Sequence, residues 1–244
     1  MMTFALPEDF GLWDGVGLGV FVLSWVVYLA ATYRSTWHDR SLTGAVGRMR
    51  ERWMETMLQR EQRMVDVQIM ASLLSNVTFF ASTSILILAG LFAALGAADR
   101  AVELVSELPY AVQTSRGLWE LKIAVLVGVF IYAFFKFGWA IRLHSYCSVM
   151  VGAAPMPGKV NDAALIAAHN TAQLSTTASA HFNDGVRAYY FGLAALAWFV
   201  NPIYLVPSSL WVVAVLWRRE FHSHSLRMIQ AALHAGEPKK DNAP

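Results

Sequence analysis

The sequence predicts an all-α fold, namely a polytopic transmembrane helical bundle with about four spans plus amphipathic or cytoplasmic helices. Of the 244 residues, 56% are apolar and only 15% are charged, whereas a soluble domain carries about 25% charged residues. The mean hydropathy is +0.43, and the apolar residues gather in stretches as long as a bilayer crossing of roughly 20 residues. These observations exclude an ordinary soluble globule and a disordered chain.

Charge and cysteine content exclude further classes. The formal net charge of +2 is too small to indicate a nucleic-acid partner. The single cysteine, Cys147, excludes an internal disulfide framework. We therefore treat residues 1–230 as a single integral membrane domain and residues 231–244 as a flexible tail.

The first three spans are expected at about 11–32, 68–97 and 118–142. The first carries one charge, Asp14, and no Lys or Arg precedes it, so the sequence indicates a retained helix and not a cleaved signal peptide. The second contains no charged residue. The third ends near Lys136, which we interpret as an anchor whose long side chain reaches the headgroups.

The last apolar stretch, 188–217, contains Pro202 and Pro207. Proline removes a backbone donor and clashes with the preceding helical turn. The stretch is therefore either one kinked span or two half-helices that turn back. Broken helices at membrane depth need protein or water to cover the freed backbone.

Residues 47–67 alternate charged and apolar side chains at helical spacing. Met49, Trp53, Met57 and Met64 fall on or near one stripe, and Arg and Glu occupy the opposite side. The segment is either an interfacial or partner-binding helix or a solvated helix that packs on its own protein.

The same region is expected to continue into the second span. Residues 48–89 contain no Pro or Gly, and their Met, Leu, Gln, Glu and Arg favour helix. We therefore predict a nearly unbroken helix from about Val46 into the span.

Residues 161–183 are rich in Ser, Thr, Asn, Gln and His, and Asp162 is their one formal charge. The segment is too polar to face lipid, because unpaired donors and acceptors are costly in hydrocarbon. We expect a helix whose polar face meets other protein, in the same chain or in a neighbouring one. A homo-oligomer supplies that cover most easily.

The positive-inside rule sets the expected orientation. The 33–67 connection carries seven Lys and Arg, which places it in the cytoplasm and the N-terminus outside. Four simple spans would leave the five cations of the tail outside. Three alternatives remain: the last stretch is re-entrant, 161–183 itself crosses the membrane, or the tail is an exception to the rule.

No catalytic signature occurs, since the chain lacks a P-loop, HExxH, CxxC or G-x-S-x-G motif. We therefore expect no enzymatic activity, no catalytic or metal-binding residue and no cofactor. Asp14 and Lys122 are expected to pair near the outer interface, either as an anchor or as part of an ion pathway. The candidate polar and charged membrane positions are Asp14, Lys122, Glu120, Ser75, Asn76, Thr78, His169, Asn170, Gln173 and His181.

Three long phrases resemble one family. They are residues 53–91 (WMETMLQREQRMVDVQIMASLLSNVTFFASTSILILAGL), 118–147 (LWELKIAVLVGVFIYAFFKFGWAIRLHSYC) and 180–202 (AHFNDGVRAYYFGLAALAWFVNP), the last followed by Arg218-Arg219-Glu220-Phe221. The chain resembles, roughly from Trp37 to Leu226, the membrane-protein family called domain of unknown function 599, found in bacteria and plants. The resemblance implies a polytopic, four-helix membrane protein and carries no site residues.

Two functions remain open. The first is a homo-oligomeric channel- or transport-like protein. The second is a structural or interaction protein that docks a partner through the amphipathic helix 47–67. The expected location is the bacterial cytoplasmic (inner) membrane, with the lipid bilayer and further copies of the chain as partners and no nucleic acid.

Overall fold

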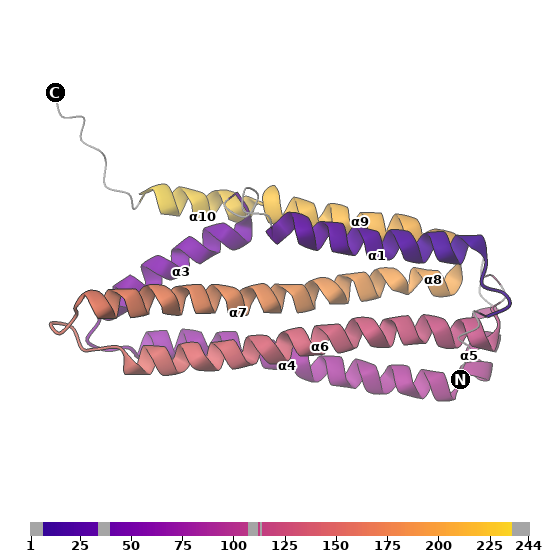
Figure 1. Cartoon of the computed structure of the whole chain (residues 1–244), viewed down its shortest axis with the longest axis horizontal. Coiled ribbons are helices and arrows are strands. Elements are labelled where there is room, and N and C mark those ends of the chain that lie inside the picture. The colour runs from indigo at the N-terminus through magenta and orange to yellow at the C-terminus, as the bar shows by residue number, and fades with distance from the viewer. Residues whose placement is uncertain (1–6, 34–39, 107–111, 113, 236–244) are drawn as a thin grey trace, which may run out of the picture. The chain divides into compact units, whose positions relative to one another are not determined.

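The computed structural model describes residues 7–33, 40–106, 112 and 114–235, and these residues form helices and no strand (Figure 1). The all-α prediction is confirmed. The helices are α1 (Leu12–Tyr33), α3 (Leu42–Leu58), α4 (Met64–Gly96), α5 (Ala98–Ser106), α6 (Arg116–Ala153), α7 (Asp162–Ala195), α8 (Ala197–Val200), α9 (Pro202–Phe221) and α10 (His224–Ala235).

Three of these helices, α1, α4 and α6, are long and apolar enough to cross a membrane. They contain 22, 33 and 38 residues. At 1.5 Å per residue, α4 and α6 are about 50 and 57 Å long, well beyond the roughly 30 Å of the hydrocarbon core. Both helices are therefore long enough to project past a bilayer.

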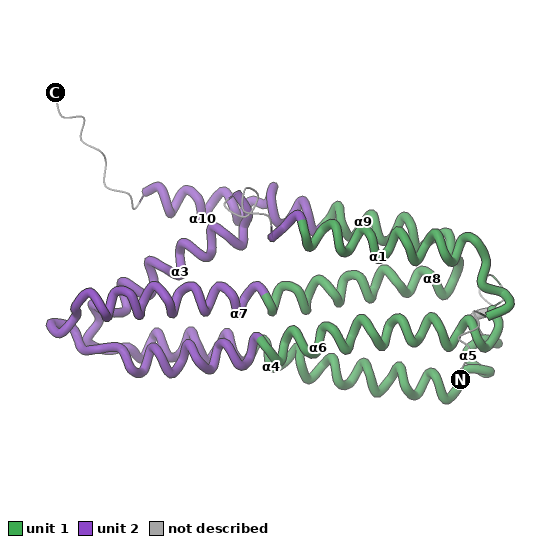
Figure 2. The backbone as a smooth tube through the Cα atoms, viewed as in Figure 1, with its two compact units in different colours: residues 1–30, 76–139, 181–215 green, residues 31–75, 140–180, 216–244 purple. Residues whose placement is uncertain are grey.

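The chain divides into two compact units (Figure 2). Unit 1 consists of Met1–Ala30, Asn76–Trp139 and His181–Val215. Unit 2 consists of Ala31–Ser75, Ala140–Ala180 and Leu216–Pro244. The long helices α4, α6 and α7 each contribute residues to both units.

Aromatic side chains fill the interior of unit 1. The ring of Phe80 from α4 lies 5.7 Å from Phe137 of α6 and 5.5 Å from Phe182 of α7, measured between centroids. Tyr189 of α7 lies 5.8 Å from Phe137. Such separations suit favourable aromatic contacts, and they join three helices around Phe137, which is fully buried.

The stretch 188–217 is divided among the end of α7, the short α8 and α9. Asn201 is extended, with φ −156° and ψ 132°. Pro202 is the first residue of α9, where a missing N–H costs nothing. The Ser208 hydroxyl of α9 donates to the Ala194 carbonyl of α7 over 3.0 Å. The chain therefore turns back at Asn201, and α9 lies beside the end of α7.

Part of the apolar side of residues 47–67 packs inside unit 2, whereas Met49 and Met64 are exposed. Met54, Met57 and Leu58 of α3 are almost completely buried against Val151 of α6 and an alanine face of α7, formed by Ala164, Ala168 and Ala172. Alanines let the α7 backbone approach closely. The amphipathic helix therefore packs on its own protein, which is one of the two alternatives that its pattern left open.

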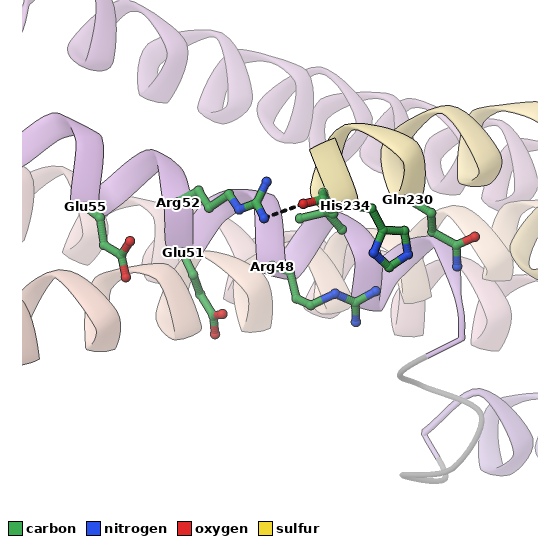
Figure 3. A pocket seen from close by; sticks show the side chains of 7 residues that line it. Arg48, Glu51, Arg52, Glu55, Gln230 and His234 are labelled. Atoms are coloured by element: carbon green, nitrogen blue, oxygen red, sulfur yellow. Dashed lines mark hydrogen bonds between the residues drawn. The ribbon is translucent and has the colours of Figure 1, made fainter. Parts of the chain in front are cut away.

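Helix α10 also packs on α3. Ala45, Leu226 and Leu233 form a small core between the two helices. The Arg52 guanidinium donates to the Ala232 carbonyl over 3.2 Å. It also donates to the Leu233 carbonyl (Figure 3). These contacts satisfy carbonyls at the C-terminus of α10 that have no partner within the helix.

The prediction of an unbroken helix from Val46 into the second span is wrong. α3 ends at Leu58 and α4 begins at Met64. The Asp66 carboxylate is fully buried; it accepts a hydrogen bond from Trp53 Nε1 over 2.7 Å and forms an ion pair with Arg60. The chain must turn between the helices to bring both partners to this carboxylate, so tertiary contacts override helix propensity.

Polar side chains of residues 161–183 divide between two faces of α7. Thr171, Ser175 and Ser179 are buried within the chain, whereas His169 and Gln173 are exposed. The chain itself therefore covers much of the helix. An oligomer is not needed to bury it.

Gly185 of α7 packs tightly against Phe137 of α6. A Cβ atom there would lie 2.4 Å from Phe137 Cε1 and 2.6 Å from its Cζ, and the buried ring has no space into which to move. We expect Gly185→Ala to lower the free energy of unfolding by about 1–3 kcal/mol. Thermal unfolding of the purified protein in detergent measures this loss. Gly138→Ala is the control, since nothing lies within 4 Å of its added Cβ; an equal loss in both variants would contradict the packing argument.

Candidate functional site

Three charged side chains meet inside unit 1, and we call Lys136, Asp184 and Arg187 the ionic cluster. Lys136 Nζ of α6 lies 2.9 Å from Asp184 Oδ2 of α7. Arg187 follows one helical turn after Asp184, and its NH1 lies 3.1 Å from Asp184 Oδ1. The side chains of Asp184 and Arg187 are 2% and 8% exposed, and that of Lys136 is 25% exposed. One buried carboxylate thus holds two cations.

Aromatic rings surround the ionic cluster. The Arg187 guanidinium lies 5.3 Å from the ring centroid of Tyr28, and Lys136 Nζ lies 5.4 Å from that of Tyr132. Trp25 of α1 meets Tyr132 edge-on at 5.4 Å. The faces of these rings attract cations. Helices α1, α6 and α7 therefore all contribute to holding the positive charges.

The position of the ionic cluster matters because burying charge is expensive. An ionised side chain away from water costs several kcal/mol unless it is paired and hydrogen-bonded. The three side chains together carry a formal charge of +1. Such an arrangement can hold α6 and α7 in register, attract an anion or relay charge.

A hydroxyl pair joins α4 to α7 in the same unit. The Ser84 hydroxyl donates to the Phe80 carbonyl over 2.9 Å and lies 3.0 Å from the Tyr189 hydroxyl. Tyr189 also donates to the Phe80 carbonyl over 3.0 Å. Ser84 thus links two helices through a buried polar contact.

A second polar group in unit 1 is centred on Trp198 of α8. Its Nε1 donates to Asp14 Oδ1 over 2.7 Å, and Lys122 Nζ lies 5.7 Å from its ring centroid. Asp14 and Lys122 are 4% and 2% exposed, and the Asp14 and Asp9 carboxylates both attract the Lys122 ammonium. Among the described residues, however, no direct ion pair joins Asp14 to Lys122. The two charges share a tryptophan, which the sequence did not indicate.

Asp9 lies just before α1 and contacts the start of α6. Its carboxylate accepts a hydrogen bond from the Ser115 backbone N–H over 2.6 Å and another from the Ser115 hydroxyl. Partial burial raises the pKa of Asp9, but the hydrogen bonds from Ser115 outweigh this and lower the pKa below its ordinary value.

The other predicted positions lie apart from the ionic cluster. Glu120 pairs with Arg116 over 2.9 Å at the exposed start of α6. His169 Nε2 lies 2.8 Å from Gln173 Nε2 on the exposed face of α7, and His169 Nδ1 lies 3.9 Å from Glu51. The remaining exposed positions are Ser75, Asn76, Thr78 and Asn170.

His181 is the predicted candidate nearest to the ionic cluster. Its ring lies 6.4 Å from that of Trp139, and its charge would interact with both Lys136 and Asp184. Its buried Nδ1 has no hydrogen-bond partner among the described residues.

The sequence reasoning missed Asp184 and Arg187 as site residues, and it interpreted Lys136 as a headgroup anchor. Lys136 instead pairs with Asp184. One signal was available: Asp184 and Arg187 are spaced i, i+3 and are the charged residues of a 34-residue helix beyond its first turn. That spacing places opposite charges on one helix face.

The described residues contain no group of three or more His, Cys, Asp or Glu side chains that could hold a metal ion. The fold and the ionic cluster define a class, that of α-helical membrane proteins with ionisable side chains inside the apolar part. Residues 16–225 match the family model described as "Protein of unknown function, DUF599". The chain therefore belongs to the DUF599 family, as its three phrases predicted. No curated protein and no solved structure matches it.

The stability of unit 1 is expected to depend on Asp184. Asp184→Asn leaves two cations without their shared carboxylate, and breaking a buried pair costs about 3–5 kcal/mol. We expect a correspondingly large fall in the midpoint of thermal unfolding in detergent. Lys136→Gln is expected to cost less, because the Asp184–Arg187 pair stays intact and Lys136 is partly exposed.

Asp99→Asn is the matched control, because its side chain is 79% exposed in an ion pair with Arg116. Exposed ion pairs contribute about 0–1 kcal/mol. Equal unfolding midpoints for Asp184→Asn and Asp99→Asn would contradict the importance of the ionic cluster.

Proposed function

We propose that the protein is a homo-oligomeric, channel- or transport-like membrane protein whose functional centre is the ionic cluster. The single observation that carries this proposal is the burial of Asp184 and Arg187, together with Lys136, in the unit that contains the most apolar helices. Ionisable residues inside a membrane are costly, and they commonly mark ion or substrate pathways.

The charge of the ionic cluster favours anions as the transported species. Two cations face one carboxylate, and anion-selective pores use Arg and Lys side chains. The nearby rings of Tyr28 and Tyr132 stabilise the cations without neutralising them. An anion that approached would therefore meet a positive centre.

The proposed topology has five membrane crossings, one for each helix that passes from one unit to the other. The chain passes between the units five times, after Ala30, Ser75, Trp139, Ala180 and Val215. Unit 2 holds fourteen of the 19 Lys and Arg residues, the cations of the tail included. The bilayer would be crossed five times, by α1, α4, α6, α7 and α9. This topology would put the N-terminal end of α1 outside and α10 inside, in agreement with the positive-inside rule.

The alternative, docking of a partner through residues 47–67, receives less support. Met54 and Met57 are 0% and 1% exposed because they pack against α6 and α7. Those methionines are therefore not available to a partner. The remaining exposed residues, such as Met49 and Met64, do not form a continuous apolar stripe.

Self-association is supported by small residues on the outer surface of the spans. A Cβ added at Gly90 of α4 or Gly128 of α6 would meet nothing within 4 Å. Glycines on a lipid-facing surface allow a neighbouring helix to approach closely. Bacterial cytoplasmic membrane is the proposed location.

Cysteine labelling tests the topology. Arg100→Cys, Lys159→Cys and Arg227→Cys each place a thiol at an exposed position, while the native Cys147 is fully buried. In sealed cells we expect a membrane-impermeant maleimide to label position 100 only. Positions 159 and 227 should react after permeabilisation. External labelling of position 227 would contradict five crossings.

Flux through proteoliposomes tests the function. We expect the purified protein to raise the passage of chloride or nitrate above that of protein-free liposomes, and Lys136→Gln to reduce it, because one of the two cations is lost. Asp99→Asn should leave the flux unchanged. Potassium flux in place of anion flux would contradict the anion preference, and the absence of any flux would favour the interaction alternative.

A further inference from the structure

Arg50 of α3 is a partly buried cation in unit 2, and the described residues give it no carboxylate partner. Its NH2 donates to the Ser179 hydroxyl of α7 over 2.7 Å. In the part of the chain that the structure describes, no ion pair involves Arg50. Burial lowers the pKa of Arg50 to about 10, which reflects the cost of removing this charge from water.

Two carboxylates in the same region of the chain, Glu51 and Asp66, have other partners. Glu51 faces His169, and Asp66 accepts from Trp53 and pairs with Arg60. The Cys147 thiol is close enough to interact with Arg50, but it donates to the Thr171 carbonyl over 3.8 Å. It therefore acts as a neutral donor and does not balance the charge.

Two further buried groups on the helices around Arg50 lack partners. His144 of α6 is 1% exposed, and a positive charge on its ring would be repelled by Arg50. Its Nδ1 makes no hydrogen bond among the described residues. Ser175 of α7 is 0% exposed, and its hydroxyl is likewise unpartnered. Ser175 lies one helical turn before Ser179, on the same face of α7.

The missing hydrogen bond of Ser175 is unusual for these helices. Helical hydroxyls can donate to the carbonyl four residues earlier. The buried Thr171 does so over 2.7 Å, and the exposed Thr177 and Ser148 do so over 3.0 and 3.1 Å. Ser179 accepts from Arg50, so its own proton is still available for donation. Arg50 thus meets only the neutral Ser179 oxygen among its described hydrogen bonds, and the Ser175 and Ser179 hydroxyls on the same face of α7 have protons with no acceptor among the described residues.

We propose that Arg50, His144, Ser175 and Ser179 form a binding site for a small inorganic anion, such as chloride or a small oxyanion. The anion supplies the charge that Arg50 lacks and accepts the protons of Ser175 and Ser179. The site belongs to unit 2 and is independent of the ionic cluster. Binding here does not require that the protein transport anything.

Anion-dependent thermal stability of the full chain in detergent tests the site. The midpoint of unfolding is measured at fixed ionic strength while sodium gluconate is exchanged for sodium chloride, sulfate or phosphate. A ligand that binds the folded state raises this midpoint with its concentration. We expect a saturable rise for at least one of the three anions, and the three arms separate chloride from oxyanions.

Two variants assign the effect to the site. Arg50→Gln should raise the anion concentration needed for half of the stabilisation by about tenfold or more, because a charged hydrogen-bond partner is lost. Ser175→Ala should weaken binding as well, yet in gluconate alone it should unfold no earlier than the wild type, because its hydroxyl has no partner to lose.

Arg48→Gln is the matched control. Arg48 lies on the same helix as Arg50, and its replacement by Gln removes the same charge. Arg48 is exposed, however, and lines an open groove of about 340 Å³ between α3 and α10 (Figure 3). The Arg48→Gln variant should respond to anions as the wild type does.

The proposal is overturned if no anion stabilises the wild type, if Arg48→Gln loses the response as fully as Arg50→Gln, or if Ser175→Ala responds like the wild type. Should Arg50→Gln fail to fold, Ser175→Ala alone decides. Because no gradient is involved, the result does not depend on whether flux is found.

Discussion

The packing of unit 1 depends on one buried carboxylate, that of Asp184. Its two oxygens hold Lys136 of α6 and Arg187 of α7, and Gly185, the next residue, allows α7 to approach the ring of Phe137 on α6. Attraction between buried charges is strong where water is excluded, but it compensates for desolvation only when the geometry is close. The close approach at Gly185 brings the helices within reach of that geometry, so packing and charge support each other at the same turn of α7.

Hydropathy alone predicted the helices that are apolar on all sides and failed where polar contacts decide the chain's path. The helices α1, α4 and α6 are long and apolar enough to cross a membrane, because about 20 consecutive apolar residues have few other structures open to them. The turn between α3 and α4 was missed, since Gln59–Arg63 contains no Gly or Pro. There the buried Asp66 at the start of α4 contacts Trp53 of α3 and Arg60 of the connection, and the sequence pattern does not reveal these contacts.

The candidate site was predictable only in part, because its contacts join residues that are far apart in the sequence. Asp14 and Lys122 stood out as charges within apolar segments, and both are buried around Trp198. Nothing in their spacing indicated that a tryptophan more than 70 residues after Lys122 would separate them. Lys136 was interpreted as an anchor because its partner lies 48 residues away on α7. Pairing between distant helices requires knowledge of their packing, which periodicity does not provide.

The arginines of the chain show how the protein compensates for buried positive charge. Arg187 meets a carboxylate, Arg60 meets another, and Arg63 donates to the carbonyls of Ala154 and Pro155. In each case oxygen atoms that carry full or partial negative charge face the guanidinium. Arg50 differs, because its one described hydrogen bond is to a neutral hydroxyl. The carboxylates and carbonyls that face Arg187, Arg60 and Arg63 contrast with the neutral Ser179 hydroxyl that faces Arg50. That arrangement is what an anion from outside the chain would require.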